Sequence, residues 1–132
     1  MSATTPPLRI LIVEDELANT DLVRASLDAL GDQFLRSSTV DAAGSLADAR
    51  AALAAKPFDL ILLDLWLPDG DGLGLARELF KMGSGRPLIV VVSGSAKPEE
   101  RVAALAVADD FLLKPFEPKL LIATINRLTH RQ

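Results

Sequence analysis

Leu60-Ile-Leu-Leu63 is an aliphatic run that ends directly at Asp64. Residues 8–13 and residues 88–92 form two similar runs, and these are followed by Glu14 and by Ser93. Runs that are apolar at nearly every position, as these are apart from Arg9, are typical of strands buried on both faces of a parallel sheet. The three runs therefore predict three central strands, each with a polar residue at its carboxyl end.

Helical patterns alternate with these strands, with Leu, Val, Ile and Ala at spacings of three to five residues. We expect helices over residues 16–30, 43–56, 73–82, 98–108 and 118–131, and weaker strands over residues 34–40 and 111–113. The alternation predicts a doubly wound α/β fold, in which a five-stranded parallel sheet lies between layers formed by five helices. We expect one domain over residues 8–131, preceded by a disordered lead over residues 1–7.

The composition excludes several classes of protein. The chain has 132 residues and a formal net charge of -4, which argues against a nucleic-acid surface and against anionic membranes. It has no cysteine, so disulfides and cysteine metal sites are excluded. Its apolar runs are far shorter than the roughly 20 residues that cross a bilayer, and we expect no signal peptide, because residues 1–7 lack its basic-then-apolar order. We expect a soluble, cytoplasmic protein.

The strand ends carry the candidate site, because ligands of such sheets bind outside the carboxyl ends of the strands. These ends supply Glu14, Asp15, Asp64, Ser93 and Lys114. Clustered carboxylates raise each other's pKa unless a cation is present, and oxygen ligands with room for water favour Mg²⁺. The metal and the lysine would neutralise a phosphoryl group while a carboxylate acts as nucleophile. This edge therefore predicts a magnesium-dependent phosphoryl-transfer site.

Each residue also has a structural interpretation when it is considered alone. Asp15 could cap the following helix, Asp64 and Ser93 could be turn residues, and Lys114 could be a solvated surface charge. Four strands would then have to place matching groups at one edge by accident, which favours the functional interpretation of the set.

With these residues in place, the chain resembles the receiver domains of two-component response regulators over about residues 8–130. The resemblance lies in four segments: Ile12-Val-Glu-Asp15, Asp64-Leu-Trp-Leu-Pro-Asp-Gly-Asp-Gly72, Val92-Ser-Gly94 and Asp110-Phe-Leu-Leu-Lys-Pro-Phe116. It implies a flavodoxin-like three-layer fold with strand order 2-1-3-4-5. It further implies that Asp64 is phosphorylated by a sensor histidine kinase or a histidine phosphotransfer protein.

The resemblance also assigns roles around Asp64. Mg²⁺, with Mn²⁺ as an alternative, would be bound by Asp15, Asp64 and the backbone carbonyl of Trp66, and by Glu14 mostly through water. Lys114 would pair with the phosphoryl group, and the Lys114-Pro115 peptide bond would be cis. The bulky Trp66 is expected to slow hydrolysis of the acyl phosphate, unless its ring lies flat on the surface.

Switching is implied at Ser93 and Phe111, with Ser93 drawn to the phosphoryl group and the Phe111 ring turning inward. Phe111 could equally be ordinary core in every state. The readout surface would be the fourth helix, fifth strand and fifth helix, over residues 98–131. This face would also serve a homodimer or a downstream output domain. The segment 104–109 lacks the family's usual glycine.

Three functions compete. The first is a phosphoacceptor signalling domain, which is not an enzyme beyond its own phosphorylation and dephosphorylation. The second is a degenerate receiver that binds partners without being phosphorylated, and the intact set of polar residues argues against it. The third is a hydrolase with an aspartyl-phosphate intermediate, which needs an acidic residue where Trp66 stands.

Overall fold

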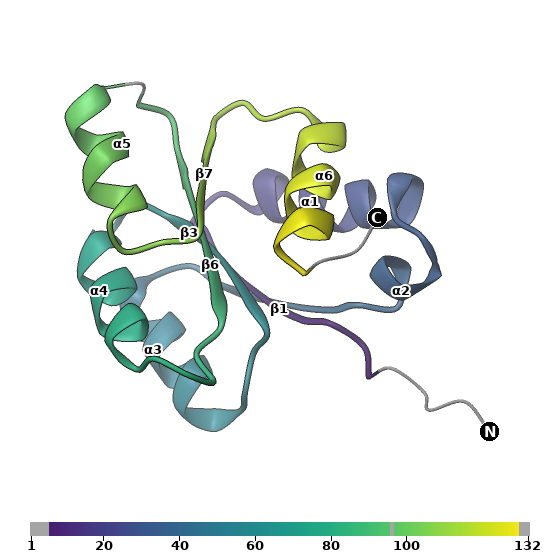
Figure 1. Ribbon diagram of the computed structural model, residues 1–132, viewed down its shortest axis with the longest axis horizontal. Helices are drawn as coiled ribbons and strands as arrows, with labels where there is room; N and C mark the ends of the chain where they lie inside the picture. Colours follow the sequence, from purple (N-terminus) through teal and green to yellow (C-terminus); the bar gives the residue numbers. More distant parts are fainter. Residues whose placement is uncertain (1–5, 96, 130–132) are drawn as a thin grey trace.

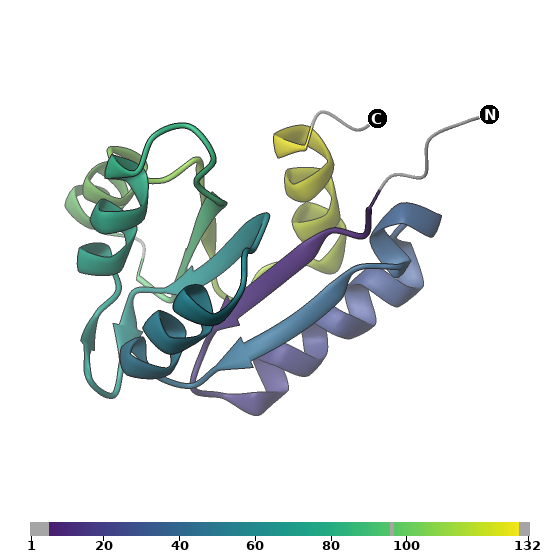
Figure 2. The same ribbon diagram turned by 90° about the horizontal axis from the view of Figure 1, so that it is seen from below.

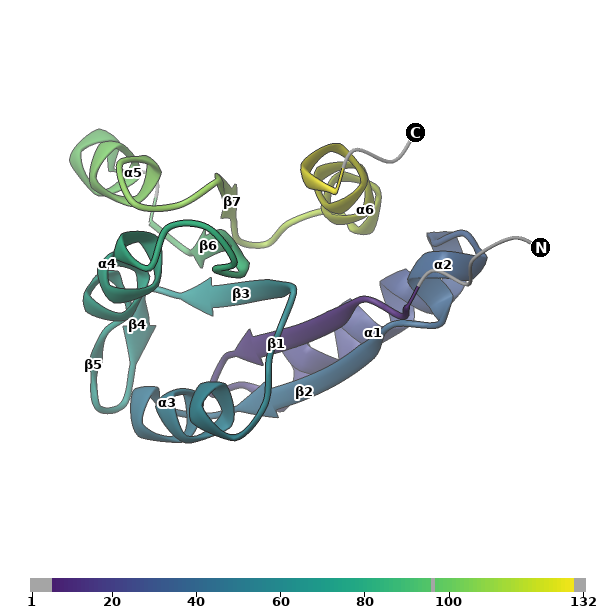
Figure 3. The same ribbon diagram turned by 60° about the horizontal axis from the view of Figure 1, so that its bottom comes forward.

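The computed structural model describes residues 6–95 and 97–129. Five strands form one parallel sheet, and Figure 3 shows them in the order β2-β1-β3-β6-β7. Counted along the chain, this order is 2-1-3-4-5, so the expected topology is confirmed. The strands are β1 (Arg9–Val13), β2 (Thr39–Ala43), β3 (Leu60–Asp64), β6 (Leu88–Ser93) and β7 (Asp110–Leu113).

Helices cover both faces of this sheet (Figures 1 and 2). One face packs against α1, α2 and α6, and the other packs against α3, α4 and α5. The described residues form six helices, one more than expected. They are α1 (Leu17–Leu30), α2 (Gln33–Arg36), α3 (Leu46–Ala55), α4 (Leu73–Lys81), α5 (Pro98–Leu105) and α6 (Pro118–Leu128).

The central strands bury alternate side chains in two separate cores. Leu60 and Leu62 of β3 pack in the core beneath α1 and α6, whereas Ile61 and Leu63 pack in the core beneath α3, α4 and α5. Because successive strand side chains point to opposite faces, both sets must be apolar in a sheet covered on both sides. This explains why the central strands are continuous aliphatic runs.

The region of the second strand differs from the prediction. The interval 34–40 was expected to be a strand, but Phe34 lies in the short helix α2 and β2 begins at Thr39. The Asp32 side chain caps α2 by accepting the N–H of Leu35 at 3.0 Å. The next helix begins at Leu46 rather than at Ala43, because Ala43 pairs with β1 at the end of β2.

Smaller differences occur elsewhere. The expected loop 66–72 contains a two-stranded antiparallel hairpin of β4 (Trp66–Leu67) and β5 (Gly70–Asp71), which lies beside α3 and α4 in Figure 3. Helix α5 ends at Leu105, short of the predicted 108. Residues 1–5 of the predicted lead, and the predicted end of the last helix at 131, lie outside the described residues.

Among the described residues, no helix has the length and apolar character needed to cross a membrane.

Candidate functional site

The carboxyl ends of four strands bring the candidate residues to one edge of the sheet. Glu14 directly follows β1, and Asp64 and Ser93 are the last residues of β3 and β6. Lys114 follows β7, and its backbone N–H donates to the Ser93 carbonyl at 2.7 Å. The parallel register pairs Asp64 with Val92, so Ser93 lies one residue beyond Asp64 on the neighbouring strand. The topology thus brings together the side chains that the sequence singled out.

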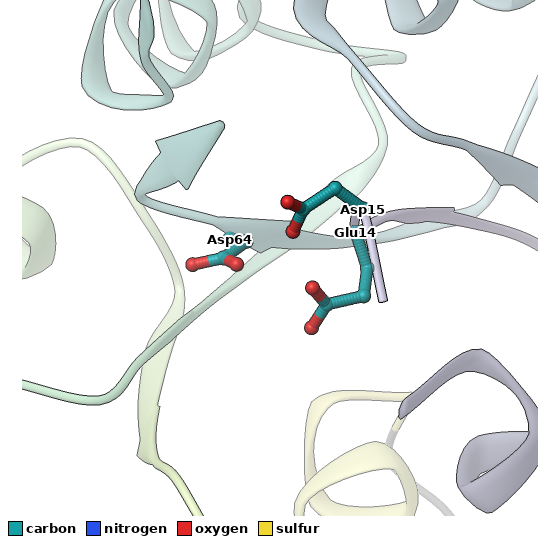
Figure 4. A group of neighbouring side chains, drawn as sticks. All are labelled: Glu14, Asp15 and Asp64. Carbon is teal, nitrogen blue, oxygen red and sulfur yellow. The ribbon is translucent and has the colours of Figure 1, made fainter. Parts of the chain in front are cut away.

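Three carboxylates gather at this edge (Figure 4). Glu14, Asp15 and Asp64 each place one oxygen so that all three oxygens lie within 4.8 Å of one another. Glu14 and Asp64 are buried, and Asp15 is exposed. Hard carboxylate oxygens with one side open to water are the donors that Mg²⁺ prefers. The donor set therefore fits a magnesium ion.

Lys114 supplies positive charge to this cluster. Its Nζ donates to Glu14 Oε1 at 2.5 Å and to Asp64 Oδ2 at 3.0 Å. Burial alone would lower the pKa of Lys114, but the hydrogen bonds and charges of Glu14 and Asp64 outweigh it and raise that pKa above its usual value. Lys114 is therefore a firmly protonated ammonium between two carboxylates.

The hairpin after β3 places main-chain groups around Asp64. The Trp66 N–H donates to Asp64 Oδ1 at 3.3 Å, whereas the Trp66 side chain is 56% exposed. The side chain is thus exposed, and its expected effect on hydrolysis of the acyl phosphate stays a prediction. The assignment of the Trp66 carbonyl as a metal ligand stays a prediction.

Gly72 closes this hairpin against the end of β3. Its N–H donates to the Leu65 carbonyl at 2.7 Å. A Cβ at this position would lie 2.4 Å from the carbonyl oxygen of Asp64, a distance that non-bonded atoms cannot adopt. Glycine is required here because the backbone returns into direct contact with the backbone of Asp64.

Ser93 is fully buried, and Phe111 is almost fully buried. The Ser93 Oγ accepts the N–H of Ser95 at 3.1 Å, so the turn role considered for Ser93 is present in this structure. The Phe111 ring packs in the core beneath α3, α4 and α5, with the Arg101 guanidinium 5.6 Å from its centroid. Their roles in switching stay predictions.

Two alternatives from the sequence are decided by the structure. Asp15 does not cap α1, because the N-cap residue of this helix is Glu16. The Glu16 side chain makes no capping hydrogen bond. Lys114 is not a solvated surface charge, since it contacts two buried carboxylates. The Lys114-Pro115 peptide bond is cis, as expected.

Two further polar residues belong to this region and were missed in the sequence. Asn19 donates from Nδ2 to Glu14 Oε1 at 2.9 Å. Asp69 accepts the N–H groups of Leu46 and Ala47 at 2.8 and 3.0 Å, which fastens the hairpin to the start of α3. The signal for Asn19 was its position in the first turn of a helix that starts at the carboxyl edge, where side chains approach the site.

Comparisons with known proteins agree with this geometry. The family model for the response regulator receiver domain matches residues 10–126. The KDP operon transcriptional regulatory protein KdpE of Escherichia coli is 42% identical over 108 residues, covering 81% of this chain and 44% of that protein. The response regulator protein PmrA of Pseudomonas aeruginosa is 38% identical over 125 residues, covering 94% of this chain and 53% of that protein.

A solved structure of a receiver domain has the same fold as this chain. The CheY-like response regulator receiver domain protein of Methanospirillum hungatei superimposes with a TM-score of 0.81 at 30% identity, covering 95% of each chain. The chain spans about half the length of the curated relatives that it matches.

Proposed function

Because this chain belongs to the family of response regulator receiver domains, we propose that Asp64 accepts a phosphoryl group in a Mg²⁺-dependent reaction. The observation that carries the proposal is the contact of Lys114 Nζ with Asp64 Oδ2 at 3.0 Å, within a cluster of three carboxylates. The nucleophile, a counter-charge and oxygen ligands for a cation thus lie together at one sheet edge.

The charge balance of this edge explains the need for a divalent cation. Three carboxylates, those of Glu14, Asp15 and Asp64, face one ammonium, that of Lys114. An incoming phosphoryl group would add further negative charge. When bound, Mg²⁺ supplies positive charge that stabilises the phosphoryl oxygens during transfer. Glu14, Asp15 and Asp64 would hold it, together with the Trp66 carbonyl.

The residues of the chain have defined tasks in the transfer. An Asp64 carboxylate oxygen attacks phosphorus, the O–P bond forms, and the N–P bond of a phosphohistidine donor breaks. The electron pair of that bond returns to the ring nitrogen, and a proton carried on the other ring nitrogen of the phosphohistidine leaves the released histidine neutral. Lys114 moves from Asp64 Oδ2 to an oxygen of the new phosphoryl group. The hydroxyl of Ser93, which accepts from Ser95 in this structure, still has its own hydrogen to donate.

Membership of the receiver family also suggests the phosphoryl donor and the surface that would report phosphorylation to a partner. The donor would be a sensor histidine kinase or a histidine phosphotransfer protein, and the chain would act as a switch rather than on a separate substrate. The readout surface would be that of α5, β7 and α6. Apolar side chains exposed on it support binding of a second copy or of an output domain: Val102, Leu105, Leu113 and Leu120. A cytoplasmic location stays a prediction.

Phosphorylation by a small donor tests the proposal directly. The protein is incubated with acetyl phosphate and Mg²⁺, and intact mass is measured. We expect one phosphoryl group on the wild type, none on Asp64→Asn, and none on the wild type in EDTA. Asp21→Asn, on the exposed side of α1, is the matched control and should be phosphorylated like the wild type.

Two results would contradict the proposal. Wild-type protein that gains no phosphoryl group would be a binding module with a receiver fold. Repeated turnover of a small phosphoester, lost in Asp64→Asn, would identify a hydrolase instead.

A further inference from the structure

The Glu14 carboxylate is held by three donors, one from the residue after β7 and two from the start of α1. Oε1 accepts from Lys114 Nζ at 2.5 Å and from Asn19 Nδ2 at 2.9 Å. Oε2 accepts the backbone N–H of Glu16 at 3.2 Å. Lys114 in turn reaches Asp64, so a continuous chain of hydrogen bonds runs from Asn19 through Glu14 and Lys114 to Asp64.

Asn19 is the one neutral side chain in this series, and it comes from a helix rather than from a strand end. It lies in the first turn of α1 and is half-buried. Asn19, Glu14 and Asp64 border the same small cavity of about 20 Å³, which is also lined by Phe116. A polar side chain on the solvent-exposed face of the helix would be hydrated by water, whereas the Asn19 amide donates to a buried carboxylate of the site.

We propose that Asn19 is a positioning residue, whose amide fixes the Glu14 carboxylate so that it directs Lys114 toward Asp64. Glu14 has three rotatable side-chain bonds, and the Glu16 N–H holds only its other oxygen. The amide of Asn19 removes the remaining rotation of the carboxylate, which sets the direction of the bond to Lys114. The consequence for phosphoryl transfer rests on the function proposed for Asp64.

Removing the Asn19 donor would act through Glu14 on two properties. Metal affinity would fall because the water-mediated contact of Glu14 would no longer be oriented. Phosphoryl transfer would slow because Lys114 would lose its fixed direction. Partners that orient metal-site residues in this way are worth roughly 10- to 100-fold in affinity or activity, and we expect the lower end of this range for Asn19.

The test is a double-mutant cycle in the full chain. Asn19→Leu removes the amide while it keeps the size and branching of the side chain. It is made in the wild type and in Glu14→Ala, and Thr20→Val is the isosteric control on the same helix turn. Magnesium affinity is read from the fluorescence of Trp66, the single tryptophan of the chain. The phosphorylation rate with acetyl phosphate is the second readout, and thermal unfolding checks that each variant is folded.

We expect Asn19→Leu to weaken Mg²⁺ binding by roughly tenfold in the wild-type background and to cause no further loss in Glu14→Ala. The Asn19 side-chain amide signals in a ¹⁵N spectrum should shift in Glu14→Ala without metal, because their acceptor is gone. Equal loss in both backgrounds, unchanged affinity in Asn19→Leu, or unshifted amide signals would overturn the role of Asn19. If the wild type gains no phosphoryl group, the function of Asp64 fails, and the Mg²⁺ titration and the amide signals still decide on Asn19.

Discussion

The two edges of the sheet use the same kinds of charged residue in opposite ways. At the carboxyl edge, Glu14, Asp15 and Asp64 gather around the single ammonium of Lys114. At the amino edge, Asp59 and Asp109 each have an arginine of their own. The amino edge is therefore balanced in charge, whereas the carboxyl edge has an excess of negative charge that a cation can neutralise.

The pairs at the amino edge join neighbouring strands. Asp59 precedes β3 and accepts from the backbone N–H and the guanidinium of Arg9 on β1, at 2.8 to 3.0 Å. Asp109 precedes β7 and accepts from the Arg86 guanidinium at 2.9 and 3.0 Å and from the Ile89 N–H at 2.7 Å. In this sheet, carboxylates that are each paired with an arginine join neighbouring strands, whereas the carboxylates left in excess at the carboxyl edge could hold a metal ion.

Lys114→Met should have the largest effect, because it removes the only cation that contacts the carboxylates among the described residues. We expect phosphorylation by acetyl phosphate to slow by roughly 100-fold, the loss usual for one charge-stabilising group. Intact mass at timed intervals measures it. Lys119→Met, on the exposed face of α6, is the control. An unchanged rate would mean that the charge excess at this edge has no part in the transfer.

Asp109→Asn should weaken the ion pair with Arg86 at the amino edge and should leave the carboxylate cluster at the carboxyl edge unchanged. The pair with Arg86 is about four-fifths buried, so we expect the free energy of unfolding to fall by about 2 kcal/mol. Urea denaturation measures this change, and Mg²⁺ affinity should stay at the wild-type value. Asp28→Asn, in an exposed pair with Arg24 on α1, should cost much less. A loss of Mg²⁺ affinity would show that the two edges are coupled.

Acid should remove the contribution of Asp109. Burial raises its pKa, but the hydrogen bonds from Arg86 and Ile89 outweigh burial and leave the pKa below its usual value. Its stabilisation is thus complete above the unfolded-state pKa of about 4 and is lost as the pH falls through the lower folded-state pKa. The difference in unfolding free energy between wild type and Asp109→Asn should be constant near neutral pH and should shrink below about pH 4. Urea midpoints over this range would show a constant difference if Asp109 stayed ionised.

Arg9→Gln should have the smallest effect. Its pair with Asp59 is exposed by 44% and 36% at the two side chains, where water screens the charges. We expect a smaller loss in unfolding free energy than for Asp109→Asn, because water screens this pair, and no change in phosphorylation. Chemical denaturation of Arg9→Gln and Asp109→Asn compares how much the two ion pairs contribute to the free energy of unfolding. A larger loss for Arg9→Gln than for Asp109→Asn would contradict this prediction.

The fold was predictable where burial dictates the residue types. Strands β1, β3 and β6 are covered on both faces, so almost all of their residues are apolar and the runs are evident in the sequence. The edge strand β2 is half-exposed and its pattern is weak, which led to the wrong interval 34–40. Helix α2 is a single turn, too short for a helical period to show, although Asp32 three residues before Leu35 was a capping signal.

The site was predictable to the extent that strand ends define it. Glu14, Asp64, Ser93 and Lys114 follow from the rule that parallel strands present their carboxyl ends at one edge. Asn19 and Asp69 do not, because their contacts depend on how a helix and a hairpin pack against that edge. The position of Asn19 in the first turn of its helix was a hint, but side-chain packing between elements leaves no periodic signal in the sequence, so the contacts of these two residues needed the structure.

The pair of Lys114 and Glu14 joins residues 100 positions apart in the chain. The strands that carry them lie at different places in the sheet, with β3 and β6 between them. The contact between Lys114 and Glu14 therefore depends on the pairing of β1, β3, β6 and β7 in one sheet. A nascent or truncated chain that lacks β7 would carry Asp64 without its lysine. Under the proposed function, such a chain would be phosphorylated far more slowly than the folded domain, so phosphorylation would also report that the sheet is complete.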